Sequence, residues 1–331
     1  MQTVALARHA MATRFEAVLH GENPVALRAA AEEALDEIER LDAQLSLYRA
    51  DSEISRINAG AAAGPVRVEP TLFRLLQHAQ RLNQETDGAF DITVAPLMRC
   101  WGFMRGEGEM PAPEAIAEAR SRVGMRHVVL EEEDFTVRFA RDGVMLDLGS
   151  IGKGFALERA AELLREAGVT SGILHGGTST VCAIGVPPGA DVWKVAVPHP
   201  ADDLLALAPP EKTASPDADS MLAVVPLKDE AMSVSAVWGK AFEAGGRVYG
   251  HVIDPRKGEP VEGAVMAAVV LPSATETDAL STALLTAGVA GHDRITQLRP
   301  EMRTLVAGRG ARPGAFHFAA KGIELNHAVI G

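Results

Sequence analysis

Apolar residues recur at intervals of three and four between positions 27 and 45, which places them on one face of a helix. The opposite face carries an acidic run that is typical of a solvated surface, and Pro24 suits the first turn of such a helix. A similar pattern predicts a second helix over 71–85. The residues of the first apolar face are Leu27, Ala31, Ala34, Ile38, Leu41 and Leu45.

Short apolar runs bounded by turn residues predict strands along much of the remaining chain. Further helices are expected at 111–122, 155–167 and 275–287. Because strands outnumber helices and do not strictly alternate with them, the pattern favours an α+β fold over a doubly wound sheet. The expected strands are 11–19, 128–130, 135–139, 144–146, 172–177, 181–186, 192–197, 221–226, 232–235, 248–253, 265–271, 302–307 and 315–319.

The chain length sets the domain organisation. With 331 residues the chain can form one large domain or two intimate subdomains around a sizeable core. We expect a single domain over 1–331, built from mixed or antiparallel sheets flanked by helices. The stretch 198–220 is rich in proline, aspartate, alanine and serine, which predicts a loop excursion within that domain.

Composition and charge exclude several classes of function. Apolar residues make up 47% and charged residues 23% of the chain, as in ordinary globular proteins. A net charge of −12 argues against a nucleic-acid partner, and an aromatic content of 5% argues against platforms for stacking bases. Cys100 and Cys182 stand in apolar surroundings without C-x-x-C spacing, so neither a disulfide framework nor a zinc site is expected.

The N-terminal residues give no targeting signal. They contain no charged segment followed by an apolar run, no cysteine that could take a lipid, and no apolar stretch approaching the length of a spanning helix. The chain as given therefore predicts a cytoplasmic protein with no membrane segment, although a chain trimmed of an export signal would look the same.

The central candidate for ligand binding is the glycine-containing stretch 147–154, which reads D-L-G-S-I-G-K-G. It follows the predicted strand 144–146 and opens a predicted helix, an order that gathers backbone N–H groups and the positive end of a helix dipole. Lys153 adds a cation, and Asp147 adds a carboxylate that could hold a ribose hydroxyl, an amide or a metal. A phosphate-bearing ligand is predicted. The alternative is a tight strand-to-helix connection, because the spacing matches neither a Walker loop nor a dinucleotide loop.

Two loop segments carry isolated polar or aromatic side chains. The stretch 87–97 is expected to form a turn, an extended segment and a proline stop. Within it, Asp91 and Thr93 stand in apolar company, where a polar pair caps backbone groups or meets a ligand. Tyr48 lies in a polar loop beside an arginine, where it caps the core or stacks on a flat ring system.

Two late segments add catalytic and metal-binding candidates. His251 and Asp254 are three residues apart around a polar turn, and His251 is either a structural hydrogen-bonding residue or a catalyst. Asp278 and Thr282 are four apart at the start of a predicted helix, so both project from one face. A carboxylate and a hydroxyl placed together suit Mg²⁺, which also takes waters and substrate phosphates as ligands. Alternatively, Asp278 serves the helix dipole and Thr282 bonds back to a carbonyl.

Six ordered segments together resemble the ApbE family, the FAD:protein FMN transferases. The match spans nearly the whole chain and is specific as a set, although each piece alone is weak. The segments are 11–13 (similar to M-G-T), 45–58 (S-x-Y/W-x-x-x-S-x-(I/L)-x-x-(I/F)-N), 86–103 (T-D-G-A-F-D-x-T-V-x-P-L followed by W-G-F), 147–154 (D-L-G-G-I-A-K-G), 251–258 (H-I-I-D-P-x-T-G) and 277–284 (A-D-A-L-A-T-A-L).

The resemblance implies a T-fold-like architecture and a reaction. Members of the family bind FAD and Mg²⁺, cleave the pyrophosphate and pass FMN to a threonine of a partner flavoprotein, releasing AMP. The implied metal ligands are Ser150, through its carbonyl, Asp278, Ser281 and Thr282. The implied FAD-lining residues are Met11, Tyr48, Ala89, Phe90, Asp91, Asp147, Lys153 and Ile253. Lys153 would add electrostatic stabilisation. His251 would handle the acceptor proton or orient the pyrophosphate, and Asp254 is the competing residue.

The sequence departs from the family pattern in ways that bear on the acceptor. The family's T-S-G-x-Y element reads V-S-A-V-W at 234–238, and Thr178 follows the glycine pair of 176–177 in place of an acidic or amide residue. Two alternatives therefore stay open. One is an FAD pyrophosphatase that releases FMN and AMP, and the other is a non-catalytic FAD carrier, against which the presence of both Asp278 and Thr282 counts.

Overall fold

The computed structural model describes residues 1–106, 108–200, 221–310, 312 and 314–326. At its centre is an eight-stranded sheet in the order β1-β2-β6-β7-β10-β15-β16-β17, in which all paired neighbours run antiparallel. The expected α+β class is confirmed. The strands of this sheet are β1 (Gln2–Ala10), β2 (Thr13–Gly21), β6 (Gly172–Gly176), β7 (Thr180–Ile184), β10 (Ala231–Ala236), β15 (Ala264–Leu271), β16 (Arg303–Arg309) and β17 (Phe316–Lys321).

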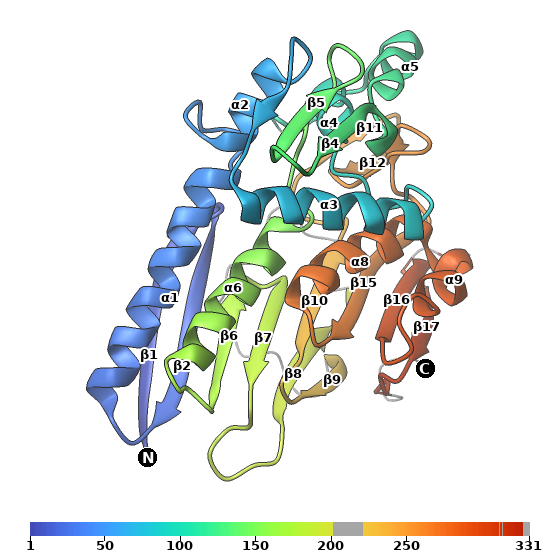
Figure 1. Cartoon of the computed structure of the whole chain (residues 1–331). Coiled ribbons are helices and arrows are strands. Elements are labelled where there is room, and N and C mark those ends of the chain that lie inside the picture. The colour runs from blue at the N-terminus through green and yellow to red at the C-terminus, as the bar shows by residue number, and fades with distance from the viewer. Residues whose placement is uncertain (107, 201–220, 311, 313, 327–331) are drawn as a thin grey trace.

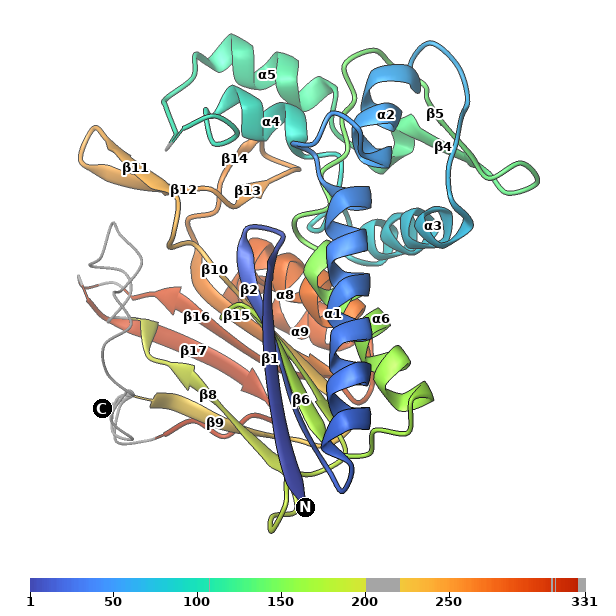
Figure 2. The ribbon, with the colours of Figure 1, turned by 90° about the vertical axis from the view of Figure 1, so that its left-hand side faces the viewer.

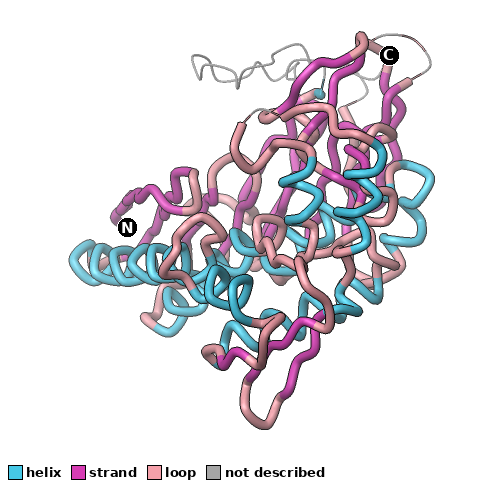
Figure 3. Tube along the Cα trace, turned by 90° about the horizontal axis from the view of Figure 1, so that it is seen from above, coloured by secondary structure: helices cyan, strands magenta, loops and turns pink. Residues whose placement is uncertain are grey.

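The two faces of the sheet are covered differently (Figures 1 and 2). Helices α1 (Pro24–Leu45), α6 (Gly152–Glu166) and α8 (Ala274–Ala287) lie side by side on one face. The hairpin of β8 (Trp193–Pro198) and β9 (Met221–Leu227) lies on the opposite face. Seen from above, most of the helices lie on one side of the strands (Figure 3). The main core fills the space between these layers.

Smaller elements gather at the upper end of the sheet (Figure 1). A second hydrophobic cluster there contains Leu97, Trp101, Phe103 and Ile253 and is separate from the main core. It is consistent with two intimate subdomains, a division that stays a prediction. The elements are α2 (Glu53–Gly60), α3 (Pro70–Glu85), α4 (Ala95–Cys100), α5 (Pro113–Ser121), β3 (Val66–Arg67), β4 (Val128–Glu131), β5 (Thr136–Phe139), β11 (Ala241–Ala244), β12 (Arg247–Gly250), β13 (Ile253–Asp254) and β14 (Glu259–Pro260); α9 (His292–Thr296) lies beside α8.

The helix predictions are confirmed within a few residues. The α1 helix begins after Asn23, whose side chain accepts hydrogen bonds from the N–H groups of Val25 and Ala26 at 3.1 Å. Its predicted apolar face is buried against the sheet. The hairpin expected over 128–139 is present as β4 and β5. Local periodicity was therefore sufficient for the long amphipathic elements.

The predicted strand 11–19 needs correction. Residues 11 and 12 form the turn of a hairpin between β1 and β2, and the strand before it was not predicted. Met11 and Ala12 have φ angles of 48° and 58°, as the central residues of a type I′ turn require. Neither residue is typical of such a turn, so the local composition does not mark it.

The predicted strand 144–146 is also wrong. The segment is extended but pairs with no strand among the described residues. Its polar groups bind elsewhere: Asn58 accepts from the Leu146 N–H at 2.7 Å and donates to the Leu146 carbonyl at 3.0 Å. The N–H of Asp147 donates to the Ile92 carbonyl at 2.7 Å. An asparagine therefore satisfies this backbone in place of a neighbouring strand.

Two further boundaries differ from the predictions. Pro96 does not stop an extended stretch, because it occupies the first turn of α4, where a missing N–H costs nothing. The expected strand 248–253 is interrupted at 251–252, so His251 lies between β12 and β13. Most of the expected excursion 198–220 falls outside the described residues.

In the part of the chain that the structure describes, no helix combines the length and apolarity needed to cross a bilayer. The cytoplasmic location stays a prediction.

Candidate active site

The predicted turn 147–154 and the predicted Asp278 meet where α6 crosses α8. The N–H of Gly154 donates to Oδ2 of Asp278 at 2.9 Å. A Cβ on Gly154 would lie 2.1 Å from the carbonyl oxygen of Ala274 and 2.7 Å from Cβ of Asp278. Only glycine permits the two helices to approach this closely. The last glycine of the turn therefore fixes the position of the carboxylate that the sequence singled out.

Lys153 places a positive charge beside that carboxylate. Its Nζ donates to the Gly149 carbonyl at 3.2 Å and lies 3.9 Å from Oδ1 of Asp278. The Asp278 side chain is only 6% exposed, whereas that of Lys153 is 23% exposed. The ammonium thus faces both solvent and a nearly buried negative charge, and it stands at the N-terminus of α6, where an anion is also favoured.

Three hydroxyl groups surround the next turn of α8. Ser281 and Thr282 donate to the Asp278 carbonyl at 3.0 Å and 3.3 Å. Ser235, from β10, lies 2.8 Å from the Ser281 hydroxyl and 3.1 Å from that of Thr282. The backward bond of Thr282 matches the structural alternative that the sequence left open. It does not exclude a ligand role, because a hydroxyl that donates keeps lone pairs for a cation.

Sequence reasoning missed Ser235 as a site residue. The one sequence signal for Ser235 is its alignment with the serine of the family's T-S-G-x-Y element, but the residues around it, V-S-A-V-W at 234–238, depart from that element. The pairing with α8 depends on the register of β10 against that helix, which no local pattern encodes.

Asp147 shapes the turn that carries Ser150. Its Oδ1 accepts the Gly149 N–H at 2.8 Å. Burial raises the pKa of Asp147 above its ordinary value, although this hydrogen bond and the charge of Lys153 act in the opposite direction. The carboxyl therefore organises the turn through its hydrogen bond to Gly149.

Tyr48 follows the C-terminus of α1 by three residues and is 70% exposed. Desolvation of its hydroxyl and the negative charge of Asp147 raise the pKa of Tyr48. Capping of the core, one of the two uses that the sequence left open, is ruled out by this exposure, and stacking on a flat ring remains.

His251 is held by the backbone of the neighbouring hairpin. The backbone N–H of His251 donates to the Lys240 carbonyl at 3.0 Å, and the ring Nδ1 lies 3.3 Å from the same oxygen. A proton on Nδ1 leaves Nε2 as an acceptor. Burial, followed by the charges of Lys240 and Lys153, lowers the pKa of His251. The ring is therefore neutral near pH 7, as a proton acceptor must be.

Asp254, the competing candidate, is already committed to an ion pair. Its side chain is 4% exposed and accepts two hydrogen bonds from the Arg256 guanidinium, each at 2.9 Å. Its Oδ1 also accepts the Arg256 N–H at 3.0 Å. These contacts organise the turn between β13 and β14. The geometry favours His251 over Asp254 as the group that handles a proton.

The remaining candidates lie on the same upper side of the molecule but are less open. Ala89, Phe90 and Ile253 are buried, at 1%, 0% and 4% exposure. The Phe90 N–H donates to the Thr86 hydroxyl at 3.2 Å and its carbonyl accepts from Asn83 at 2.8 Å, so in this structure Phe90 supports the loop from within. Asp91 is 7% exposed, and its Oδ1 accepts from the Thr93 hydroxyl and N–H at 2.5 Å and 2.8 Å. Burial raises the pKa of Asp91. Met11 projects from the β1–β2 turn and packs partly on the main core.

The donor set around Asp278 fits a hard cation. Among the described residues no group of three histidine, cysteine, aspartate or glutamate side chains could hold a metal. Asp278, Ser281 and Thr282 contribute one carboxylate and two hydroxyls; the Ser150 carbonyl is a further ligand only by the family resemblance. An all-oxygen set with one charge suits Mg²⁺ completed by phosphate and water, and does not suit zinc.

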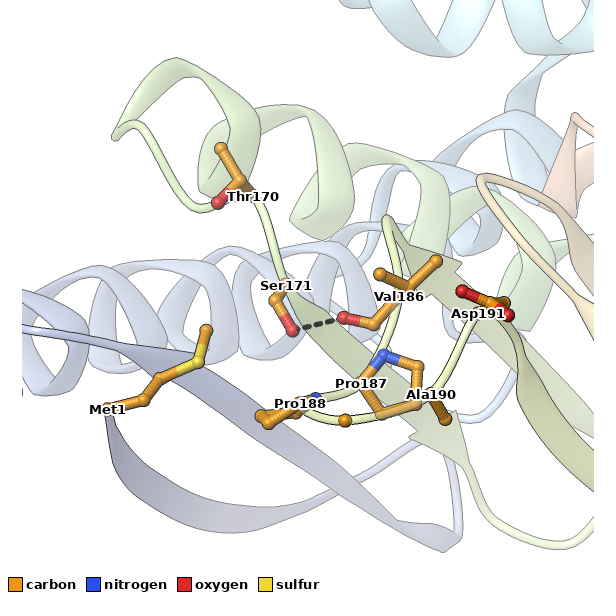
Figure 4. A pocket seen from close by; sticks show the side chains of 9 residues that line it. Met1, Thr170, Ser171, Val186, Pro187, Pro188, Ala190 and Asp191 are labelled. Atoms are coloured by element: carbon orange, nitrogen blue, oxygen red, sulfur yellow. Dashed lines mark hydrogen bonds between the residues drawn. The ribbon is translucent and has the colours of Figure 1, made fainter.

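A hollow of about 490 Å³ lies elsewhere, at the end of the sheet near the N-terminus (Figure 4). It is lined by Met1, by 170–171 and by 186–191, and Ser171 donates there to the Val186 carbonyl at 2.6 Å. None of the predicted site residues lines it. The Ser171 hydroxyl is satisfied by that bond, and the hollow lies apart from the residues that carry the predicted chemistry.

The model of the ApbE family matches residues 11–306, which is nearly the whole chain and contains all the predicted site residues. This chain belongs to the ApbE family. The FAD:protein FMN transferase of Haemophilus influenzae is 30% identical over 282 residues, covering 82% of this chain and 77% of the relative. That of Treponema pallidum is 30% identical over 277 residues, covering 82% and 75%.

Solved structures agree with this assignment. The ApbE protein of Thermotoga maritima superposes with a TM-score of 0.82 at 27% identity and covers 96% of both chains. The apo flavinyl transferase ApbE of Pseudomonas stutzeri gives a TM-score of 0.80 at 27% identity, covering 97% of this chain and 95% of that one. The ApbE-like architecture expected from the six segments is confirmed.

Proposed function

We propose that this chain is an Mg²⁺-dependent FAD:protein FMN transferase that modifies a threonine of a target flavoprotein. The observation that carries the proposal is the junction of α6 and α8, where the Gly154 N–H, Lys153 and Asp278 converge beside two hydroxyls. The reaction is inferred from the names of several relatives. The junction contributes groups suited to binding a pyrophosphate with its cation.

The proposed reaction is a displacement at phosphorus. The threonine oxygen of the acceptor forms a phosphoester bond with the phosphorus of the FMN half of FAD. The bond from that phosphorus to the oxygen bridging the two phosphates breaks, and AMP leaves with the bridging oxygen. The threonine proton passes to a base on the enzyme. Atoms and charge balance without an oxidant or a reductant.

Each group of this chain has a task in the proposal. Asp278, Ser281, Thr282 and the Ser150 carbonyl would hold Mg²⁺, which when bound supplies charge neutralisation to the pyrophosphate oxygens. Lys153 stabilises the same negative charge from the helix N-terminus. Nε2 of His251 accepts the threonine proton, because its ring is neutral and Nδ1 is directed at a carbonyl.

The flavin half would lie among the loops above the junction. We assign Tyr48 to stacking on the ring system, since its phenol is largely exposed, and Asp147 to hydrogen bonding. We also assign Met11, Ala89, Phe90, Asp91 and Ile253 to this site, on the basis of the family segments that contain them.

The test is incubation of the purified chain with FAD and Mg²⁺, with and without a flavoprotein domain that carries an acceptor threonine. Intact mass should show an FMN-sized gain on the acceptor with an equal amount of AMP. An acceptor in which that threonine is replaced by valine is the matched control. Equal FMN and AMP release in every tube would instead indicate a pyrophosphatase, and intact bound FAD with no AMP would indicate a carrier.

A further inference from the structure

Two pairs of contacting hydroxyl groups join strand β10 to helix α8, and each pair is called a step below. Ser233 and Ser235 are two apart on the strand, and Thr277 and Ser281 are four apart on the helix, so matching pairs face each other. Ser233 lies 2.9 Å from the Thr277 hydroxyl, and Ser235 lies 2.8 Å from the Ser281 hydroxyl. An almost entirely buried helix must satisfy its hydroxyls in this way.

The two steps differ in what surrounds them. Ser233 is 1% exposed and Thr277 is 0% exposed, and both also bond within the core, to Thr180 and to the Ala274 carbonyl. Ser235 is only half-buried, and it has a second hydroxyl partner, Thr282, at 3.1 Å. The first step is a core contact, whereas the second lies beside Asp278.

A hydroxyl can serve a cation only if its proton points elsewhere, because each hydroxyl has one proton and two lone pairs. The Asp278 carbonyl can accept that proton from Thr282, but at 3.3 Å, while it also accepts from Ser281 at 3.0 Å. The Ser235 hydroxyl offers Thr282 a closer acceptor at 3.1 Å, and it can donate its own hydrogen bond to the Ser281 hydroxyl at 2.8 Å. In this arrangement both lone pairs of Thr282 remain available.

We propose that Ser235 is a positioning residue for the cation site: its hydroxyl accepts a hydrogen bond from the Thr282 hydroxyl and so directs the lone pairs of Thr282 at the metal. The proposal rests on the Mg²⁺-dependent function proposed above. Ser235 itself touches neither metal nor substrate. It acts as outer partners of metal ligands do, by fixing the orientation of the group that binds.

The experiment compares Ser235→Ala with Ser233→Ala, the same change one step deeper on the same strand, and with Ser235→Thr, which restores the hydroxyl. Each full-length variant is titrated with Mn²⁺ alone, and free Mn²⁺ is counted by its electron paramagnetic resonance signal. Thermal midpoints are recorded in parallel, as is the Mg²⁺ concentration that gives half-maximal turnover of FAD.

Ser235→Ala should weaken Mn²⁺ binding by about tenfold, as for loss of an outer partner of a ligand. The Mg²⁺ activation constant should rise by a similar factor, with kcat at saturating Mg²⁺ largely retained. Ser233→Ala should lower the thermal midpoint and leave Mn²⁺ affinity unchanged, and Ser235→Thr should recover binding. Equal Mn²⁺ affinity in Ser235→Ala and wild type would overturn the role of Ser235 alone. Absence of Mn²⁺ binding to the wild type would overturn the metal site, and with it both proposals.

Discussion

At the scale of single residues, Gly154 shows how the site is assembled. A side chain there would meet backbone, the Ala274 carbonyl at 2.1 Å, which cannot turn aside as a flexible side chain could. Gly152 is in the same helix, yet its Cβ would meet nothing closer than 3.9 Å. A methyl group is therefore excluded at Gly154, whereas Gly152 has room for one.

Gly154→Ala should separate α6 from α8 and lower the free energy of unfolding by at least about 2 kcal/mol, within the range for overpacking a core. It should also remove the N–H contact to Asp278 and reduce turnover. Gly152→Ala is the control and should be neutral or stabilising by up to about 1 kcal/mol, since alanine favours helix. Urea denaturation of both variants measures the difference, and similar losses in the two would contradict the close-approach argument.

His251 governs the expected pH dependence of turnover. Because burial lowers its pKa from the ordinary 6.5, the ring stays neutral above that pH and gains a proton only below it. The value of kcat/KM should therefore fall as pH decreases below about 6.5 and be flat above it.

His251→Gln should remove that acidic limb and reduce kcat by about 10²–10⁴-fold, the usual contribution of a positioned acid or base. His20→Gln is the matched control. Burial lowers the pKa of His20 too, but this residue lies beside Ser171, near the other end of the sheet. A rate profile measured from about pH 5 to about pH 8 decides the matter. An acidic limb that persists in His251→Gln would assign the proton to another group.

At the scale of elements, α8 carries the metal candidates and is fixed at its start by charge. Glu276 accepts from the Arg299 guanidinium at 2.7 Å and 2.9 Å and lies 3.2 Å from His78 of α3. Burial would raise the pKa of Glu276, but its hydrogen bonds to His78 and Arg299 outweigh burial and lower the pKa to about 2. The segment that presents Asp278 is thus tied to α3 above it (Figure 1).

A carboxyl whose folded pKa is lowered stabilises the protein above its unfolded pKa of 4.5, and this contribution is lost as pH falls towards about 2. Glu276→Gln should therefore cost about 2 kcal/mol near neutral pH, below the roughly 3–5 kcal/mol for breaking a fully buried pair. It should also flatten the acid dependence of stability. The exposed Arg28–Glu32 pair provides the control, since Glu32→Gln should change stability by less than about 0.5 kcal/mol. Parallel denaturation curves at neutral and acidic pH that show equal losses for both variants would refute this account of the helix start.

Elements whose signal is local could be predicted, and those that depend on distant partners could not. The apolar face of α1 was evident because period and burial agree over 22 residues. The extended segment 144–146 resembled a strand by composition, but Asn58, 88 positions away, satisfies its backbone. The turn at Met11 and Ala12 lacked the glycine or asparagine that would mark it. Ser235 could not be predicted as a site residue, because its contacts depend on how β10 and α8 are aligned with each other.

At the scale of the whole molecule, most of the proposed groups lie at one end of the sheet, above or between the layers, while the hollow at the other end lacks them (Figures 1 and 4). The resemblance of six short segments identified most of these groups, because those segments contain the turns and the helix start that carry them. It could not identify the acceptor protein, because acceptor recognition depends on an exposed surface that the six segments do not include.

Ligand-linked stability tests whether the two halves of the proposed site are separable. A ligand present at about a hundred times its Kd raises the free energy of unfolding by about 2.7 kcal/mol, so FAD and Mg²⁺ should each raise the thermal midpoint. In Asp278→Asn the amide oxygen still accepts the Gly154 N–H, so the helix junction is retained while the charge is lost. We expect the increment from FAD to persist, and the increment from Mg²⁺ and the turnover to disappear. Asp293→Asn, at a side chain that is 97% exposed, should keep both increments. An Mg²⁺ increment that survives in Asp278→Asn would place the cation on phosphate alone, and unchanged turnover would remove Asp278 from the metal site.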